Sequence, residues 1–436
     1  MYLPASYAFD LPGLPPLDKN NLATLGVLIG MAISQPQKLM SIGIGKIVIG
    51  TTLFSLICSI GTALTNSDTW FSGPVTIQGL RPYDIMSLFV ATILNVIIPL
   101  FIGRALFNTI DDALTLLATW AKVMIPYTVL MLIEVRMSPQ IHTWLYGYYP
   151  HSFAQTMRAS GFRPNVFMNH GLTLAFFLLM AALSALIVHR VRKSPPKLKN
   201  SGFIYVYLMT FLVFCRSLAP FIYLIPSYFA IRFAQPRQQI TIAKILVLIV
   251  FLYPTLRLQP WFPSEELLEM AEEVSPQRRQ SLQFRFENEE TLLISSRERP
   301  LWGWGGYGRG HTYDPFTGQD LTIIDGQWIG SLSASGYLGM LAYFVPVFGV
   351  VYVASGAIRR TRDQREKAVI GGMCMMLAIY GVNTLPNSTA DFMHLFLSGS
   401  IYGIAYNMRR GRGGLEQRIP NHLGFRRHPP MPTSPT

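Results

Sequence analysis

Long apolar runs separated by short polar segments dominate this sequence. Eleven runs approach or reach the roughly 17–25 residues with which an α-helix crosses the hydrocarbon core of a membrane. These runs are 22–35, 46–65, 84–102, 113–134, 166–189, 202–217, 218–231, 240–256, 328–354, 368–385 and 390–408. The pattern predicts an all-α, polytopic membrane protein with about 11 transmembrane helices, within a range of about 10–12.

The composition argues against several soluble domains. Half of the 436 residues are apolar, 14% are charged, and the mean hydropathy is +0.32. Soluble domains carry about 25% charged residues, so a soluble fold of this composition would lack polar side chains to cover its surface. The three cysteines, Cys58, Cys215 and Cys374, lie in or beside apolar runs, and we expect them to be buried small hydrophobic residues.

The net charge of +13 comes from short basic clusters between the apolar runs. No basic domain with interleaved aromatic residues stands apart from these runs, so nucleic acid is not an expected partner. The clusters at 190–199 and 359–367, and the tail that begins at Arg409, predict cytoplasmic segments by the positive-inside rule. Lys46 and Lys122 interrupt otherwise apolar stretches, which leaves the N-terminal topology open.

Five segments follow from this topology. They are N-terminal transmembrane helices (1–134), central transmembrane helices that begin with an outer loop at 135–165 (135–256), a large periplasmic loop (257–327), C-terminal transmembrane helices (328–408) and a basic, disordered cytoplasmic tail (409–436). The turn near Arg216 and the segment 384–390 are expected on the same outer side as the two loops.

The segment 257–327 holds 12 of the 23 acidic residues. It predicts a first short helix over 263–274 with Ser264 as a possible N-cap. A second helix is expected over 276–294, with Arg285 and Glu289 four residues apart and able to pair on one face.

Arg216 lies between two apolar runs of only about 14–16 residues. An arginine at membrane depth costs about 2.5–3.5 kcal/mol and usually faces a cavity or a charged partner. Two interpretations remain: an arginine at a tight turn that extends to the interface, or an anion-binding arginine in an outward-facing pocket. In the outer loop before the fifth run, Arg158 and Arg163 form either a cationic approach to the same place or an ordinary interfacial loop.

A glycine-dense run, 301–311, occupies the second half of the large loop. Trp302, Trp304 and Tyr307 offer flat faces of the kind that stack on sugar rings, with Arg309 beside them, although aromatic residues near a membrane also form interfacial belts. The run lacks the spacing of a nucleotide phosphate loop. Two side chains near it could act as a general base, Asp325 and His311, and Asp325 could instead cap the next helix.

These groups, in this order, resemble the O-antigen ligase and polymerase-like superfamily of bacterial membrane proteins. The matching elements are Arg158, Gly161, Phe162, Pro164 and Asn165 in the outer loop, Arg216-Ser217 between two short spans, Arg285 on a loop helix, Pro300-Leu-Trp-Gly-Trp-Gly305, and Gly336-Tyr-Leu-Gly339. One element departs from the family: where many members have a His-Asn pair at the head of the next span, this chain has Asp325-Gly326.

The resemblance implies a GT-C-like fold in the bacterial inner membrane and transfer of glycan from an undecaprenyl-diphosphate carrier on its outer face, without a metal or another cofactor. Arg216 and Arg285, with Arg158 or Arg163, would bind the diphosphate, and Asp325 or His311 would activate the acceptor hydroxyl. The implied partners are the lipid-linked oligosaccharide, an acceptor glycan, membrane lipids and other proteins of polysaccharide assembly.

A polymerase is favoured over a ligase because the departure at Asp325-Gly326 moves the chain away from typical ligases. A transporter of lipid-linked sugars and a non-catalytic scaffold are the alternatives from other classes. Inverted repeats, which transporters often contain, are not evident in the sequence.

Overall fold

The computed structural model describes residues 9, 15–149, 153–158, 161–191, 197–388 and 391–409. Within these ranges the chain is helical apart from four short strands. The tail expected over 409–436 lies outside the described residues except for Arg409.

The helices are α1 (Lys19–Ser34), α2 (Pro36–Ile42), α3 (Lys46–Thr65), α4 (Pro82–Thr92), the π-helix η1 (Ile93–Ile97), α5 (Ile98–Leu106), α6 (Ile110–Met137), α7 (Ile141–Tyr146), the 3-10 helix η2 (Phe153–Thr156), α8 (Gly171–Val191), α9 (Ser201–Phe214), α10 (Ala219–Phe233), α11 (Pro236–Arg257), α12 (Ser264–Val274), α13 (Pro276–Ser296), α14 (Gln327–Phe348), α15 (Val350–Ile358), α16 (Gln364–Asn383) and α17 (Met393–Arg409). The strands are β1 (Trp70–Ser72), β2 (Val75–Ile77), β3 (Met157–Arg158) and β4 (Gly161–Phe162), which form two antiparallel pairs, β1–β2 and β3–β4.

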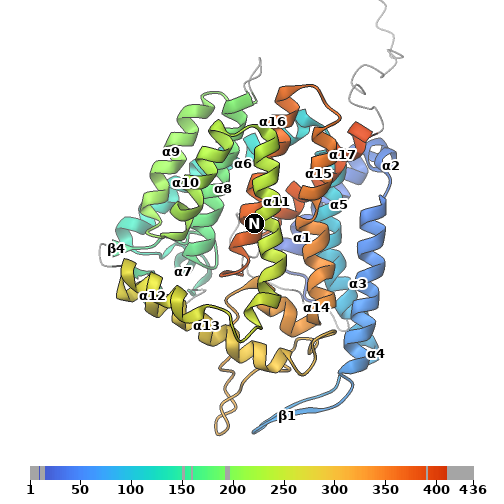
Figure 1. Ribbon diagram of the computed structural model, residues 1–436, viewed down its shortest axis with the longest axis vertical. Helices are drawn as coiled ribbons and strands as arrows, with labels where there is room; N and C mark the ends of the chain where they lie inside the picture. The colour runs from blue at the N-terminus through green and yellow to red at the C-terminus, as the bar shows by residue number, and fades with distance from the viewer. Residues whose placement is uncertain are drawn as a thin grey trace, which may run out of the picture.

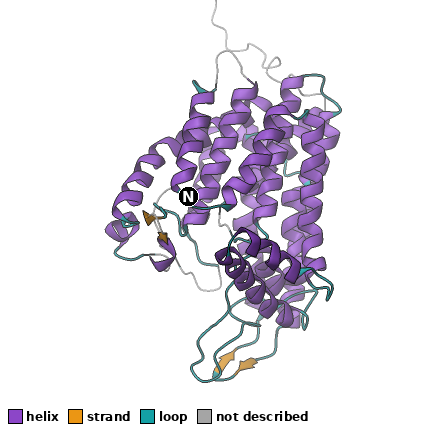
Figure 2. Cartoon of the chain, turned by 60° about the vertical axis from the view of Figure 1, so that its left-hand side comes forward, coloured by secondary structure: helices purple, strands orange, loops and turns teal. Residues whose placement is uncertain are grey.

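A helix occupies each of the eleven apolar runs, which confirms the expected helical, multi-pass architecture. In the described residues, six helical segments are long and apolar enough to cross a membrane: Lys46–Thr65, Pro82–Leu106, Ile110–Met137, Gly171–Val191, Pro236–Arg257 and Gln327–Ile358. The long helices lie side by side as a bundle, and α12 and α13 lie across one end of it (Figures 1 and 2).

Contacts between residues at or near the ends of the helices define the two ends of this bundle. At the end that we call the basic end, Nη2 of Arg190 donates to the carbonyl oxygen of Ala234 (2.9 Å), and Arg365 lies 3.3 Å from Asp111. Arg190, at the start of one predicted cytoplasmic cluster, and the cluster at 359–367 therefore lie at the same end.

The opposite end, which we call the loop end, carries the segments that the sequence places on the outer side. Arg299 of the large loop is 3.0 Å from Asp68, which precedes β1. The backbone N–H of Gln327, at the start of α14, donates to the carbonyl oxygen of Thr384, at the end of α16 (3.0 Å). Of the segments that the sequence places on the outer side, the large loop and the end of α16 therefore lie at this end.

Two of the long helices are interrupted. Between α4 and α5 the five residues of η1 form a π-helical segment just before Pro99, whose ring removes one backbone donor from the helix. In α14 the backbone leaves the helical region at Gly336, with φ 63° and ψ −172°. Such interruptions at membrane depth require other groups to satisfy the freed backbone atoms.

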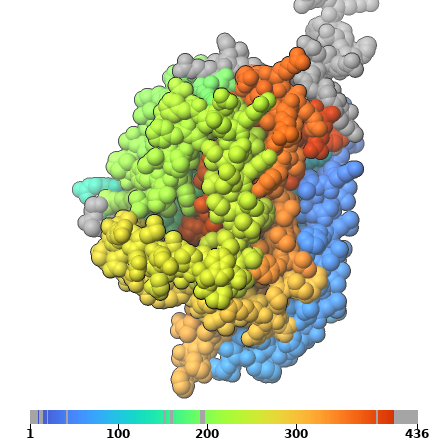
Figure 3. All heavy atoms as spheres, viewed as in Figure 1, coloured from blue at the N-terminus to red at the C-terminus, as the bar shows by residue number. Residues whose placement is uncertain are grey.

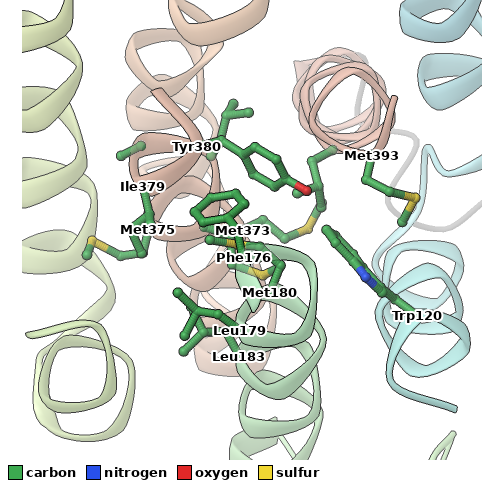
Figure 4. Packing of buried hydrophobic residues seen from close by; sticks show 14 of the residues in the cluster. Trp120, Phe176, Leu179, Met180, Leu183, Met373, Met375, Ile379, Tyr380 and Met393 are labelled. Carbon is green, nitrogen blue, oxygen red and sulfur yellow. The ribbon is translucent and has the colours of Figure 1, made fainter. Parts of the chain in front are cut away.

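The core is formed by helices that are apolar on all sides. In the apolar stretch of α8 that is long enough to cross a membrane, 89% of the residues are buried. Helix α8 packs against α6, α9, α10 and α16. Phe176 of α8 makes an edge-to-face contact with Tyr380 of α16 (4.8 Å between ring centroids), and Trp120 of α6 lies next to both helices (Figure 4).

Both helices predicted in the large loop are present as α12 and α13, with two differences in detail. Pro263 rather than Ser264 occupies the cap position of α12, because the helix already begins at Ser264. Glu289 turns toward the bundle and lies 3.3 Å from Arg257 of α11, so its ion pair is with Arg257 rather than with Arg285.

Candidate functional site

Arg216 lies in the tight turn between α9 and α10. Helix α9 ends at Phe214, and α10 begins at Ala219 with Pro220 in its first turn, where a missing backbone donor costs nothing. The turn forces Arg216 to φ 49°, a left-handed conformation that is uncommon for a residue other than glycine. The side chain is half-buried, and within the described part of the chain its buried Nη1 has no hydrogen-bond partner.

The outer loop meets this turn. Nη2 of Arg163 donates to the carbonyl oxygen of Arg216 (3.4 Å), and Arg163 is only 7% exposed. A Cβ on Gly161 would lie 2.6 Å from Nη1 of Arg216, so the guanidinium of Arg216 lies directly against the backbone of β4. The structure therefore brings two of the predicted cationic groups together. Arg158 belongs to β3, which pairs with β4, but its side chain lies outside the described residues.

A buried carboxylate that sequence reasoning overlooked holds the outer loop in place. Glu134, near the end of α6, is 1% exposed and accepts hydrogen bonds from the backbone N–H groups of Asn165 (2.7 Å), Val166 (2.6 Å) and Ile141 (3.3 Å). An acidic residue in an otherwise apolar run is the sequence signal that could have identified it. Glu134 fixes the backbone immediately after Arg163.

Arg285 reaches the same region from α13. It is half-buried and close enough to the phenol of Tyr223, in the first half of α10, for an electrostatic interaction. Arg216 lies in the turn just before α10, so the two arginines come from different segments of the chain, and the interaction of Arg285 with Tyr223 relates α13 to α10.

The position of α13 depends on its buried face. Arg257 of α11 contacts Glu289 and Glu290 (both 3.3 Å), donates to the carbonyl oxygen of Phe286 (3.2 Å), and packs against the rings of Phe262 and Phe286. Burial raises the pKa of Glu289 to about 7, although Arg257 and the hydroxyl of Tyr253 act in the opposite direction.

Asp325 also lies next to α13. Nδ2 of Asn288 donates to its carboxylate (3.4 Å), and Asn288 is one helical turn beyond Arg285. Gly326, and not Asp325, is the cap residue of α14. The carboxylate is half-buried at the loop end, on the helix face that also carries Arg285.

His311 and Arg309 lie elsewhere in the large loop. Nδ1 of His311 is 2.7 Å from the carboxylate of Asp320, and the His311 ring stacks on Tyr313. Partial burial alone would raise the pKa of Asp320, but hydrogen bonds from His311 and Thr322 lower it. Arg309 is 1% exposed and donates to the carbonyl oxygens of Asp68 and Gln78, which gives it a structural role beside β1 and β2.

The predicted sugar-stacking residues differ in exposure. Trp304 is buried, donates from Nε1 to the carbonyl oxygen of Ser295 (2.9 Å), and has Arg299 over its ring. Trp302 is half-buried and lies so close to α3 that a Cβ on Gly61 would be 2.3 Å from its ring. Tyr307, which is 59% exposed, is the member of the group whose ring is open to a ligand.

The glycine-dense run instead fills the interruption of α14. Backbone N–H groups of Trp304 and Gly305 donate to the carbonyl oxygens of Ser333 (2.8 Å) and Ala334 (2.7 Å), and Tyr337 N–H donates to Pro300 (2.8 Å). The freed backbone groups around Gly336 are thus satisfied by the Pro-Leu-Trp-Gly-Trp-Gly segment, and the two elements of the resemblance are parts of one structural unit.

A hollow lies between α10 and α11 on the side of the bundle, just above α12, and red-coloured atoms of the C-terminal part of the chain are seen inside it (Figure 3). Tyr223 of α10 makes an edge-to-face contact with Phe176, which contacts Tyr380. The hydroxyl of Tyr380 lies 3.3 Å from both carboxylate oxygens of Asp391.

Asp391 belongs to a buried polar group that the sequence prediction did not include. His394 of α17 has Nδ1 3.5 Å from the carboxylate of Asp391 and Nε2 2.7 Å from the hydroxyl of Tyr343 of α14. Asp391 and His394 are 5% and 4% exposed. Ionisable residues inside a membrane bundle are costly and usually functional, and their place at the head of the last apolar run is the signal that could have identified them.

The cationic part of the site suits an anion. Arginine remains charged at any working pH, and its planar fork matches the oxygens of a phosphate. Among the described residues, no cluster of three or more His, Cys, Asp or Glu side chains could hold a metal ion.

No protein-family model matches the chain, and no curated protein matches it.

Proposed function

We propose that this protein is a membrane glycosyltransferase that takes glycan from an undecaprenyl-diphosphate-type donor, in O-antigen, capsule or exopolysaccharide synthesis. The observation that carries the proposal is the hydrogen bond from Arg163 to the carbonyl oxygen of Arg216 just before α10, together with the electrostatic interaction between Arg285 of α13 and Tyr223 of α10. We place this site on the outer face of a bacterial inner membrane, in a GT-C-like bundle of about 11 spans with a cytoplasmic C-terminus.

The donor chemistry explains why several arginines would meet there. Cleavage of the glycosidic bond leaves a diphosphate with two or more negative charges. Guanidinium groups that bind this developing charge more tightly than the ground state accelerate the reaction. The hollow between α10 and α11 opens toward the side of the bundle, which is the direction from which an isoprenoid chain in the membrane would approach.

The base that activates the acceptor hydroxyl is proposed to be Asp325. Its carboxylate lies on the face of α13 that carries Arg285, whereas His311 is paired with Asp320 in a separate part of the loop. Removing His311 is therefore expected to affect turnover less than removing Asp325.

The test compares purified variants in transfer from a lipid-linked oligosaccharide. Arg216→Ala and Arg285→Ala should each lower turnover about 100-fold or more, the usual cost of removing one group that stabilises transition-state charge. Arg237→Ala at the basic end, where the side chain is exposed, is the matched control and should leave turnover unchanged. Wild-type turnover in both arginine variants would refute the donor site.

A second variant displaces the guanidinium group of Arg216 without removing it. Gly161→Ala would place a Cβ 2.6 Å from Nη1 of Arg216 and should reduce turnover with all arginines present. Gly306→Ala is its control, because Gly306 also has a positive φ (78°) but no atom within 4 Å of the added Cβ. Equal activity of the two variants would contradict a role for the position of Arg216.

Analysis of surface glycan in cells distinguishes the possible products. We propose a polymerase, whose loss should leave single lipid-linked repeats on the outer side. A ligase would instead leave finished lipid-linked polymer without attachment to its acceptor.

A transporter of lipid-linked sugars is the second candidate because α14 is interrupted at Gly336, and transporters often contain broken helices. Here the loop segment 300–305 fills the interruption, which argues for a fixed structure rather than a gate. Loss of a transporter would accumulate single repeats on the inner side of the membrane.

A further inference from the structure

A second polar cavity lies in the bundle, separate from the arginines. It has a volume of about 160 Å³ and lies between α3, α4–η1 and α14. Six of its lining residues carry small hydroxyl side chains: Ser55, Ser59, Thr62, Thr92, Ser331 and Ser335. The other lining residues are Cys58, Gln327 and Tyr343 and the non-polar Leu88, Val96, Gly339 and Ala342. Charged side chains do not line it, which makes it unsuitable for a diphosphate and suitable for a neutral hydroxylated group.

A stripe of small residues also occurs where membrane helices simply pack closely. Ser55 indicates that close helix packing is not the whole explanation for these residues. It is 3% exposed and lines the cavity, and its buried hydroxyl oxygen has no hydrogen-bond partner among the described residues. A buried hydroxyl without a partner costs free energy unless a ligand or water completes its hydrogen bonding.

Tyr343 supplies a second fixed polar group. Its hydroxyl lies 2.7 Å from Nε2 of His394, whose Nδ1 is 3.5 Å from the carboxylate of Asp391. This hydrogen bond uses one position of the Tyr343 hydroxyl and leaves another for a group in the cavity, which Tyr343 lines. The buried Asp391–His394 pair thereby orients the phenol.

The shape of the cavity limits what it can hold. Sites for whole drug-sized ligands are about 300–1,000 Å³, so this one fits a single ring-sized unit. The π-helical segment η1 follows Thr92 and includes Val96, both of which line the cavity, and such segments are frequent at functional sites. The lining extends to Gln327, which is two residues after the proposed base, Asp325, in the chain.

We propose that this cavity binds one neutral sugar unit of the acceptor through its hydroxyl groups, with Ser55 and Tyr343 as the main hydrogen-bonding contacts. Only the identification of this sugar as part of the acceptor rests on the proposed function. The binding of a neutral sugar can be tested without any transfer reaction.

Cys58 is a reporter in the cavity wall. In the full-length protein with Cys215→Ala and Cys374→Ala, the remaining thiol is Cys58, and its rate of modification by N-ethylmaleimide can be followed by mass spectrometry. A panel of methyl glycosides of common hexoses should slow this modification, whereas inorganic pyrophosphate should not.

Ser55→Ala and Tyr343→Phe should each raise the glycoside concentration needed for protection by about fivefold, the effect of losing one hydrogen bond. Thr52→Ala is the matched control on α3, because the Thr52 hydroxyl bonds to the carbonyl oxygen of Val48 and does not line the cavity. Thermal unfolding of each variant reports separately on helix packing.

Three results would overturn the proposal: a Cys58 that does not react, protection by no glycoside of the panel, or protection that Ser55→Ala and Thr52→Ala affect equally. If an alkyl detergent slows the modification of Cys58 and no glycoside does, the cavity binds a lipid chain and the proposal is overturned. Protection by glycosides together with full transfer activity in Arg216→Ala would refute the donor site and leave the sugar site standing.

Discussion

Arg216 combines an unfavourable backbone conformation with a buried guanidinium nitrogen, Nη1, that has no hydrogen-bond partner among the described residues. The left-handed conformation costs a residue with a side chain about 1–2 kcal/mol, and proteins keep such strain mainly at functional positions. Because the same turn would be less strained with glycine, the identity of this residue is better explained by its guanidinium than by its backbone.

Arg216→Gly should therefore separate stability from activity. We expect its melting temperature to equal or exceed that of Arg216→Ala, because glycine adopts φ 49° without a steric penalty. Both variants should lose transfer activity equally. Differential scanning fluorimetry and the transfer assay measure the two effects, and an active Arg216→Gly variant would contradict the proposed role.

The sequence did not show which residues of the glycine-dense run are buried. Trp304 and Arg309 resemble a sugar-binding pair in the sequence, but both are buried and hydrogen-bonded to backbone carbonyl oxygens. The burial of these two side chains follows from the many glycines around them. A glycine-dense run lets the backbone pack closely over large side chains as readily as over a ligand.

At the scale of the element, α14 and the run 300–305 form one unit. A Cβ on Gly336 would lie 2.3 Å from the backbone of Leu301, and a Cβ on Gly303 would lie 2.4 Å from the backbone N of Gly336. Neither position can accept a side chain without displacing backbone atoms.

Gly336→Ala should destabilise the protein by roughly 3 kcal/mol or more, because it combines a left-handed alanine with a backbone collision. Gly356→Ala in α15 is the matched control, since a Cβ there meets no atom within 4 Å, and it should be neutral or slightly stabilising. Thermal unfolding in detergent measures both. A Gly336→Ala variant as stable as Gly356→Ala would show that the two segments are not packed together.

The docking of α13 should depend on pH through Glu289. Its folded-state pKa of about 7 exceeds the ordinary value of 4.5, so the folded state binds the proton more tightly than the unfolded state. The contribution of Glu289 to stability is therefore fully present below pH 4.5 and is lost as the pH rises through about 7.

Glu289→Gln imitates the protonated form. It should match the wild-type melting temperature at low pH and exceed it above pH 7, by a free energy on the order of 2 kcal/mol. Glu290→Gln is the matched control, because Glu290 contacts the same Arg257 but is 42% exposed. Parallel pH profiles of wild type and Glu289→Gln would contradict this assignment.

At the scale of the whole molecule, the two ends of the bundle predict two sides of a membrane. The loop end carries α12 and α13, and the basic end carries Arg190 and the cluster at 359–367. Cationic loops are retained on the cytoplasmic side during insertion, so the basic end is expected to face the cytoplasm.

Single cysteines in a variant without Cys58, Cys215 and Cys374 test this orientation. Glu298→Cys at the loop end should react with a membrane-impermeant maleimide from outside the cell membrane, and Arg362→Cys at the basic end should react only after permeabilisation. Both residues are exposed. Reaction of the two cysteines from the same side would refute the topology.

The sequence by itself determined the positions of the long helices and the alternation of the segments between them. Apolar length and the placement of lysine and arginine are local properties, and the cost of exposing polar backbone in a membrane leaves the helix as the outcome. It also indicated that Arg216 and the outer loop belong together, through a resemblance in their order along the chain.

Only the tertiary structure decided which side chains meet. Helices such as α8 and α16 are apolar on every side, so their sequences contain no periodic pattern that indicates which face contacts which neighbour. The contacts of Arg163 with Arg216, of Asn288 with Asp325, and of His394 with Tyr343 join residues 37 to 53 positions apart. Such pairings depend on how the helices rotate and shift as they pack, and packing is a property of the whole bundle.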